Sequence, residues 1–543
     1  MNLAEGDSHT SPVIRKALHL MKNCLTLLGV AAALLSPMKA TANPLTESAP
    51  RAEPLTLDAI VTSPTKRPAT LKSSPRNVES LVGKALDTKQ PTDVPEVFQE
   101  SAGVFVQRTN RGAGAPIIRG LIGPQNLIIV DGVRFNTATF RTGPNQYLAL
   151  LDPHAIRSAE VLLGPSSVLY GSGAMGGVVY VNYDTPTLAV DDEFTFDGDV
   201  AVHFQSADMA DGFSARFNGA VGDVAFLVSG SASRFGTLRS GGGLMVPNSD
   251  YVAGYWQAKF LYAPSEHLEL SAGYNGMLMR DAGRTDKFGI GEIRLYDNDD
   301  HLAYLRVTHN SDGLFRESRL TGSFHQLDEF IDRYNCKRGP DGTVLDRQAC
   351  RDLQLDTLTK RRHYDDRITV LGAEAESLLV TLEDRLNISI GADFFHDTVT
   401  SSRDDAVPAG VSYGSGDWNF KPKSRGNFSN GSHYSSFGAY LHGDGSILKN
   451  ESLELRLSAG TRFSNFAAFA PDVPGVGDVD YSHGGLVFSG GVQLLLDNNI
   501  NIYTSFAQGF RAPNLQESTV LGDTGSKFEI PKIKPFTTSS ICT

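Results

Sequence analysis

The sequence lacks an excess of basic residues. Its 49 lysines and arginines stand against 61 aspartates and glutamates, which gives a net charge of −12 at pH 7. Because a nucleic-acid-binding protein needs local positive charge to hold the phosphate backbone, this balance argues against that class. Cysteine is scarce as well, with four residues in 543. No His lies between Cys336 and Cys350, so the usual four-ligand zinc site is not expected, and we predict no metal site and no bound cofactor.

Long apolar helical segments are also missing. The apolar stretch from Cys24 to Leu35 is too short to span a bilayer as a helix. It follows Lys22 and ends in small residues near Ala42, which is the order of a secretory signal peptide. We therefore expect residues 1–42 to be a signal peptide, with Met21 as a second candidate for the start of translation.

Export has a consequence for the cysteines. An exported protein folds in an oxidising compartment, where Cys336 and Cys350, which flank a polar segment, are expected to form a disulfide. Two free thiols are the alternative.

Residues 43–75 are rich in Pro, Thr and Ser, and we interpret them as a flexible periplasmic leader. One apolar, β-prone island interrupts the leader: Leu57, Asp58, Ala59, Ile60, Val61 and Thr62. Pro64 and Pro68 follow it and are expected to keep it out of any sheet in the body of the chain. An exposed strand on a tether suits addition to the sheet edge of a partner protein. A disordered leader with chance apolar residues is the alternative.

Residues 76–186 have the pattern of a compact α/β domain. The sequence predicts a short helix at Val94–Ser101 and strands at Val104–Val106, Ile117–Gly120 and Leu127–Val130, the last ending in an Asp-Gly turn. The G-x-G-x-x-G run from Gly171 to Gly176 has the form of a dinucleotide fingerprint. However, β-branched and aromatic residues follow it and predict a strand, not the helix that the fingerprint requires.

From residue 187 onward the sequence alternates between apolar and polar residues. Thirteen segments have this strand pattern: Val200–Gln205, Phe213–Val221, Val224–Ser231, Trp256–Tyr262, His267–Tyr274, His301–His309, Ser318–His325, Ile368–Ala373, Leu386–Phe395, Ser435–His442, Leu453–Ser458, Leu486–Leu494 and Ile500–Phe506. Soluble sandwiches and β-helices also alternate. The signal peptide favours a transmembrane β-barrel, as does the contrast between the tight turn at Asp497–Asn499 and the long polar loops expected at Asp328–Asp365 and Thr398–Gly431.

Several motifs together resemble the TonB-dependent outer-membrane receptors. The plug-like stretches are Ile118–Gly120, Ile129–Val133, Ala159–Gly171 and Gly176–Val179; Leu57–Thr62 is similar to the TonB box, and Gly509–Pro513 to a barrel motif. The plug motif often has Arg where this chain has Leu163. The resemblance implies a small α/β plug domain (76–186) inside an antiparallel transmembrane β-barrel (187–543) in the outer membrane of a Gram-negative bacterium.

The resemblance also implies a function and partners. A receptor of this type takes up a scarce extracellular ligand, with TonB as its periplasmic partner, binding at Leu57–Thr62, and with outer-membrane lipid around the barrel. The ligand-facing plug loops are then expected to include Arg108, Arg111, Phe135, Phe140, Arg141 and Tyr147. A ferric siderophore is the first expectation for the ligand. Haem or haemoglobin is the second, although no His follows His483, and cobalamin or a glycan are further alternatives.

Enzymatic motifs occur only out of context, and we predict that the protein is not an enzyme. The adjacent carboxylates Asp365–Asp366 and Asp404–Asp405 lie in polar stretches without a supporting base, and the G-x-S-x-G match at Gly410–Gly414 is not at a strand-to-helix turn.

One expectation concerns completeness. The resemblance implies about 22 barrel strands, more than the thirteen segments found, and the tail after Lys532 neither alternates nor ends in an aromatic residue. An open sheet would leave backbone groups unpaired in lipid. We therefore expect a barrel truncated at its C-terminus, and a non-functional, truncated receptor is a further alternative.

Overall fold

The computed structural model describes residues 60–71, 74–141, 143, 145–382, 385–408, 418–423, 425–473, 477–496 and 500–519. All of them belong to the compact unit Asp58–Thr543. The expected signal peptide and the first half of the apolar island, Leu57 to Ala59, lie outside the described residues. Among the described residues, no helix is long and apolar enough to cross a bilayer.

A five-stranded mixed sheet forms the centre of the α/β unit. Its strand order is β3 (Val78–Val82), β8 (Ile156–Leu163), β9 (Gly177–Tyr183), β6 (Asn126–Val130) and β7 (Val133–Arg134), with β6 and β9 parallel. Around it lie the hairpin β4 (Val104–Asn110) and β5 (Ala113–Ile118) and the helices α2 (Lys84–Lys89), α3 (Val94–Val97) and α4 (Ser167–Tyr170). The expected α/β fold is confirmed, with a shorter helix at Val94.

The sequence explains why these strands lie at the centre. All five residues of β6, Asn-Leu-Ile-Ile-Val, are buried, because a strand covered on both faces needs a continuous apolar run. The turn after it has φ 50° at Asp131 and 82° at Gly132, and Val130 pairs with Val133. A two-residue hairpin with both φ values positive is the geometry that Asp-Gly favours. The glycine-rich run from Gly171 leads into strand β9, as predicted, and not into a helix.

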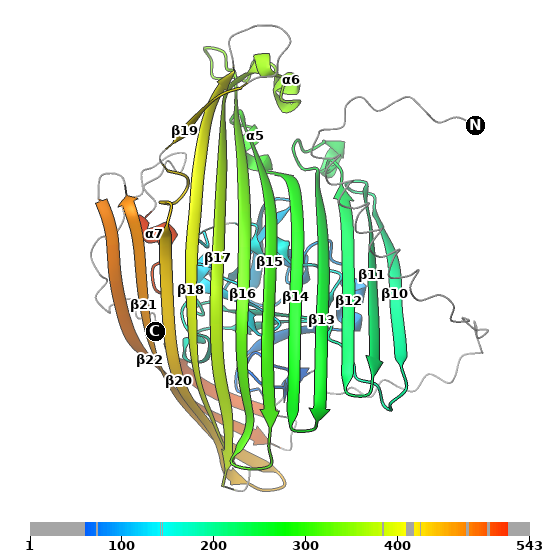
Figure 1. The fold of residues 1–543 in the computed structure, drawn as a ribbon, viewed down its shortest axis with the longest axis vertical. Coiled ribbons are helices and arrows are strands. Elements are labelled where there is room, and N and C mark those ends of the chain that lie inside the picture. The colour runs from blue at the N-terminus through cyan, green and yellow to red at the C-terminus, as the bar shows by residue number, and fades with distance from the viewer. Residues whose placement is uncertain are drawn as a thin grey trace, which may run out of the picture. The chain divides into compact units, whose positions relative to one another are not determined.

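The second part is a large antiparallel sheet of 14 described strands (Figure 1). They are β10 (Thr195–Gln205), β11 (Ala210–Val221), β12 (Val224–Phe235), β13 (Tyr251–Ser265), β14 (Leu268–Gly283), β15 (Glu292–Asn310), β16 (Phe315–Cys336), β17 (Leu358–Thr381), β18 (Leu386–Pro408), β19 (Trp418–Lys423), β20 (Ser432–Lys449), β21 (Leu453–Val473), β22 (Gly477–Leu496) and β23 (Ile500–Ala507). Each strand pairs with the next in the chain, except that β18 pairs with both β19 and β20. All thirteen expected segments coincide with strands, His267 alone lying one residue before its strand β14, and β19 is the addition.

The outer face of this sheet is apolar. Along β16, Leu320 is 57% exposed while its neighbour Thr321 is buried, and the same contrast recurs on other strands. Large exposed apolar side chains include Phe226, Phe260, Leu305, Phe324, Leu371, Phe394, Phe437, Leu441, Phe463 and Phe488. Apolar residues facing outward and polar residues facing inward are the pattern of a transmembrane β-barrel wall.

The strands in the middle of the sheet are much longer than a membrane requires. Strands β16, β17 and β18 have 22, 24 and 23 residues, whereas about 10 tilted residues cross a bilayer. The expectation that Asp328–Asp365 and Thr398–Gly431 are loops is therefore wrong in part, since the strands continue to Cys336, from Leu358 and to Pro408. Outside lipid a strand needs no apolar face, so the alternation that marks the rest of the strand is lost there.

The two ends of the sheet differ. At one end, short turns join the strands, for example between Val221 and Val224 and between Ser265 and Leu268. At the other end, longer connections carry helices α5 (Thr285–Phe288) and α6 (Arg347–Arg351), seen at the top of Figure 1. We call these the turn end and the loop end. Strands β10 and β23 end the pairing path and pair with no further strand among the described residues.

The apolar island is not free of the body of the chain. Ile60–Val61 forms strand β1, which pairs with β2 (Ala69–Thr70), and the side chain of Val61 is fully buried. The β1–β2 pair is a sheet of its own, separate from the other described sheets, so among the described residues Ile60 and Val61 join no sheet of the body of the chain, as expected from Pro64 and Pro68.

A disulfide joins Cys336, the last residue of β16, to Cys350 in α6, with 5.8 Å between the Cα atoms. Both side chains are buried beside Ile293, Tyr334 and Leu358. The bond therefore fixes the connection between β16 and β17 onto the loop end of the sheet.

We expect the double variant Cys336→Ser/Cys350→Ser to keep the large sheet and to loosen residues 337–357. A cross-link that closes a loop of about 15 residues contributes roughly 3 kcal/mol, so its loss should increase local opening. Trypsin cleavage after Lys337, Arg338 or Arg347, followed by mass spectrometry, should be roughly tenfold faster than in the parent. The variant Cys24→Ser/Cys542→Ser is the control, and an unchanged cleavage rate in the test variant would contradict the expectation.

Candidate functional site

A cavity of about 350 Å³ lies at the loop end, between the α/β unit and the large sheet. The α/β unit contributes residues from the β4–β5 turn, including Asn110 and Gly112, and from the segment Arg141–Gln146. Strands β14 to β18 and their connections supply the rest of the lining. A concave site of this size between rigid elements is typical of a small-molecule binding site.

Arginine dominates the lining of the cavity. Six arginines line it: Arg141, Arg284, Arg294, Arg333, Arg362 and Arg403. The tyrosines Tyr296 and Tyr364 and the amides Asn145, Gln146 and Asn427 lie among them, and none of the described lining residues is an Asp or Glu. We call this site the arginine cavity.

Three of these arginines form a row across neighbouring strands. Arg294 in β15 lies directly opposite Arg333 in β16, and Arg333 lies directly opposite Arg362 in β17. Like charges at directly opposite positions of antiparallel strands destabilise a sheet. We call these three residues the arginine ladder.

Carboxylates next to the cavity balance four of the six arginines. Arg284 Nε lies 2.9 Å from Asp286, Arg294 Nε lies 2.8 Å from Glu292, and Arg403 Nε lies 2.7 Å from Asp405. Arg141 pairs with the buried Glu329.

Arg333 and Arg362 differ from these four. No carboxylate among the described residues lies within ion-pair distance of either, and their Nε atoms are buried without a hydrogen-bond partner. The guanidinium of Arg333 stacks over the ring of Tyr364, 4.8 Å from its centroid. The ladder therefore keeps positive charge that nearby protein groups do not neutralise.

Of the six residues expected to face a ligand, only Arg141 lines the cavity. Arg108 pairs with Asp93 at 2.5 Å, and Arg111 pairs with Asp208 at 2.6 Å, so both are held by carboxylates. Phe135, Phe140 and Tyr147 are each 2% exposed and belong to the core, where Phe140 stacks on Tyr147 and Phe135 on His325. Burial raises the pKa of the Tyr147 hydroxyl. In this structure these three rings therefore do not present a surface to a ligand.

The arginine ladder itself was not expected from the sequence. Its members come from three strands, and only the pairing register brings them together. The sequence signal was the density of arginine in this region, such as Arg361–Arg362, within segments expected to be loops.

At the turn end, the last residue of the apolar island and the chain directly after it are bound to the α/β unit. The amides of Thr62 and Ser63 donate hydrogen bonds to the buried carboxylate of Glu160, at 3.0 and 2.8 Å. The hydroxyl of Tyr170 donates to the carbonyl oxygen of Ser63 at 2.8 Å. Residues Thr62 to Ser63 are thus held by polar contacts to strand β8 and helix α4.

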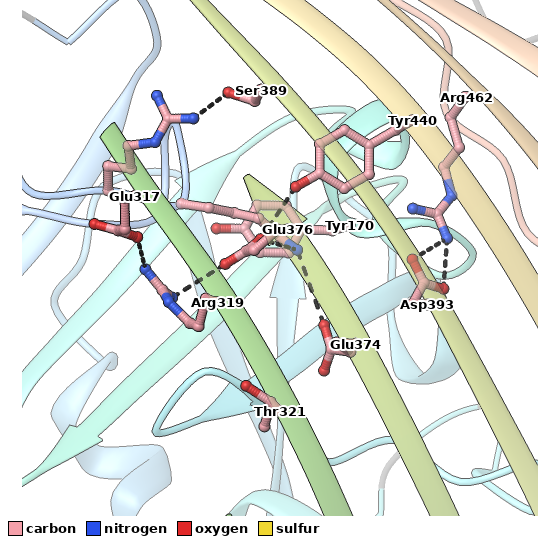
Figure 2. A network of polar contacts seen from close by, with 12 residues as sticks. Tyr170, Glu317, Arg319, Thr321, Glu374, Glu376, Ser389, Asp393, Tyr440 and Arg462 are labelled. Carbon is pink, nitrogen blue, oxygen red and sulfur yellow. Dashed lines mark hydrogen bonds and ion pairs between the residues drawn. The ribbon is translucent and has the colours of Figure 1, made fainter. Parts of the chain in front are cut away.

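The same segment is bound to the large sheet through Lys66. Its Nζ lies 3.3 Å from Glu376 and 3.9 Å from Glu374, both in β17. Arg319 and the hydroxyl of Tyr440 also contact the carboxylate of Glu376, each at 3.1 Å (Figure 2). Burial alone would lower the pKa of the Lys66 ammonium, but Glu376, Tyr440 and Glu374 raise it well above the usual value, so this lysine stays charged. We call this set the Lys66 network.

Sequence comparisons agree with this architecture. The profile described as TonB-dependent Receptor Plug Domain matches residues 70–178, and the profile described as TonB dependent receptor-like, beta-barrel matches residues 248–541. The hemin receptor of Yersinia pestis is 25% identical over 249 residues, which cover 44% of this chain and 36% of that protein. The heme/hemopexin utilization protein C of Haemophilus influenzae is 35% identical over 140 residues, 26% of this chain and 18% of that protein. The chain thus spans about a third or less of the length of these relatives.

Solved structures share the fold. The Pseudomonas aeruginosa protein FpvA, bound to pyoverdines, superposes with a TM-score of 0.64 at 13% identity, covering 83% of this chain and 59% of that one. The copper transporter OprC superposes with a TM-score of 0.61 at 16% identity, covering 81% and 64%. The Serratia marcescens hemophore receptor HasR gives a TM-score of 0.60 at 13% identity, covering 82% and 65%.

We expect Lys66→Met to release the N-terminal segment from the large sheet. The substitution leaves the partly buried carboxylate of Glu374 without its lysine and removes one of the cations that contact Glu376, which is unfavourable. In a Cys24→Ser/Cys542→Ser background carrying Thr62→Cys as a reporter, thiol labelling should be about tenfold faster. Lys89→Met is the control, because the exposed pair of Lys89 with Glu100 contributes little. Equal labelling rates in all three proteins would rule out a holding role for Lys66.

Proposed function

Because the chain belongs to the TonB-dependent outer-membrane receptors, we propose that it takes up a scarce extracellular iron compound, a ferric siderophore, with energy delivered by TonB. The α/β unit is the plug and the large sheet is the barrel wall in the outer membrane. The observation that carries the proposal is the arginine cavity, since it lies at the loop end between the plug and the wall. Long loops mark the extracellular end of such barrels.

The energy must enter at the opposite end. In strand β17, 14 residues separate Arg362 of the cavity from Glu376 of the Lys66 network, so at 3.3 Å per residue the two sites are about 45 Å apart along the strand. We propose that TonB adds a strand to Leu57–Thr62 from the periplasm. Tension on that segment would first reach the contacts of Thr62, Ser63 and Lys66.

Haem is the second candidate ligand. The observation that favours it is the similarity to the hemin receptor of Yersinia pestis and to the heme/hemopexin protein of Haemophilus influenzae. Against it, no His or Cys is among the described residues that line the arginine cavity. The proposal contains no catalytic step.

Deletion of residues 57–62 should abolish uptake without reducing binding. The full chain is produced in a host that has TonB and lacks its own receptor for the tested compound, and ⁵⁵Fe uptake is measured with ferric citrate, a ferric catecholate and haemin. Whole-cell binding should stay within about twofold of the parent, because the deletion lies about 45 Å from the cavity, while energised uptake falls to background.

Deletion of residues 47–52, in the same leader, is the matched control and should leave both quantities unchanged. Uptake that survives loss of 57–62 would contradict TonB coupling through this segment. Accumulation of haemin alone would favour haem over a siderophore.

A further inference from the structure

The arginine cavity has a charge imbalance that a ligand must correct. Four of its six arginines have a carboxylate partner beside the cavity, and Arg333 and Arg362 have none among the described residues. A protein that needed arginine here only for stability would place an acid opposite each one, because directly opposed like charges are unfavourable. The uncompensated charge therefore calls for an anion from outside the chain.

The unpartnered atoms show how the anion binds. The Nε atoms of Arg333 and Arg362 are buried and meet no acceptor in the described structure. A buried donor without an acceptor is costly and rare in folded proteins. Nε and one Nη of a guanidinium form a fork that matches the two oxygens of a carboxylate. Each arginine thus offers an unused fork.

The spacing of the arginines in the ladder restricts which anions can bind both of them. Side chains at directly opposite positions of neighbouring strands lie about 5 Å apart, so Arg333 and Arg362 present two neighbouring forks. The ring of Tyr364 supports one of the two, since the guanidinium groups of Arg333 and Arg403 stack 4.8 and 5.4 Å from its centre. A pair of neighbouring forks fits a ligand that carries two carboxylates close together.

We propose that Arg333 and Arg362 bind two carboxylates of one compact, polyanionic ligand, with the remaining arginines of the cavity completing its neutralisation. The inference rests on the proposed uptake function, because it names the class of ligand bound at the same site. Two sources share this chemistry: an iron chelate of an α-hydroxycarboxylate such as citrate, and the two propionates of haem. The cavity, with polar side chains over most of its lining and a volume of about 350 Å³, favours the compact chelate.

The test measures equilibrium binding to the full chain in detergent. The probes are ferric citrate, haemin, haemin dimethyl ester and a neutral ferric hydroxamate, and the variants are Arg333→Gln and Arg362→Gln. Each variant should weaken ferric citrate binding by about 10- to 100-fold, the effect of losing one charge-assisted fork. The affinity of the parent should fall steeply with added salt, and the neutral hydroxamate should not bind.

Arg367→Gln is the matched control. Arg367 lies in the same strand as Arg362, five residues away and therefore on the opposite face, where it pairs with Asp328 at 2.7 Å. This variant should bind ferric citrate like the parent. A second readout excludes simple misfolding: Arg333→Gln and Arg362→Gln should raise the thermal midpoint of the unliganded protein, because they relieve the repulsion in the ladder.

The outcomes separate the inference from the function on which it rests. One outcome would support the carboxylate assignment and identify haem as its source. In this outcome the parent binds haemin but neither ferric citrate nor haemin dimethyl ester, and both variants bind haemin more weakly than the parent does. Two other outcomes would overturn the inference without contradicting the proposed uptake function. These are equal binding of ferric citrate to the parent and to both variants, and preferential binding of the neutral hydroxamate. Arginine-dependent binding without any energised uptake in cells would instead contradict the proposed function.

Discussion

The polar contact between the plug and the inner face of the sheet is the interaction on which the rest of the structure depends. Because the outer face of the sheet is apolar, the inner face carries the charged and amide side chains. Lys259 of β13 lies 2.9 Å from Asp131 of the plug, and both side chains are almost fully buried. Asp397 of β18 accepts the amide of Ala138 at 2.6 Å. Such contacts specify one position for the plug, yet they add little net stability, because each group loses hydration that water restores when the contact opens. An interface of this kind holds the plug in one position, yet it opens at a modest cost in free energy.

Polar contacts and strand pairing also link the plug segment at the turn end to the plug segment that lines the arginine cavity. At the turn end, Thr62 and Ser63 are bound to Glu160 of the plug while Lys66 is bound to Glu376 of the wall. A force on the segment before Thr62 therefore meets the plug and the wall within five residues. Strand β8, which carries Glu160, pairs with β9, and β9 pairs with β6. The segment from Arg141 that lines the cavity lies downstream of β6 and β7 in the chain, so the central sheet of the plug physically joins the segment bound to Glu160 to the cavity lining.

Much of the fold was predictable from local patterns, and the reasons for the failures are physical. All thirteen expected segments are strands, because a wall between lipid and polar interior forces alternation with period two. Strand β19 was missed because it is short, polar and contains Pro422. The extensions of β16 to β18 were missed because a strand outside lipid needs no apolar face.

The site was harder to predict than the fold. Of the expected ligand residues, Phe135, Phe140 and Tyr147 are core residues, since an aromatic side chain in a glycine-rich loop fits a buried position as well as a binding surface. Arg294, Arg333 and Arg362 are separated by dozens of positions in the sequence and meet only through register, and a shift of one residue would move any of them to the other face.

The arginine ladder is hidden in the sequence, because only the pairing of the strands brings its members together, and it becomes recognisable once that pairing is known. In the plug interface several buried backbone donors meet a carboxylate: the amides of Thr62 and Ser63 bind Glu160, and the amide of Ala138 binds Asp397. The Nε atoms of Arg333 and Arg362 meet no acceptor in the described structure, and the two residues lie directly opposite one another in adjacent strands and line the same cavity. A stabilising role does not account for such a pair, because replacing either arginine with a neutral side chain would remove repulsion from the sheet. Retaining the pair is unfavourable for the cavity without an anion, and the polyanionic ligand proposed above would remove this cost by pairing with both guanidinium groups.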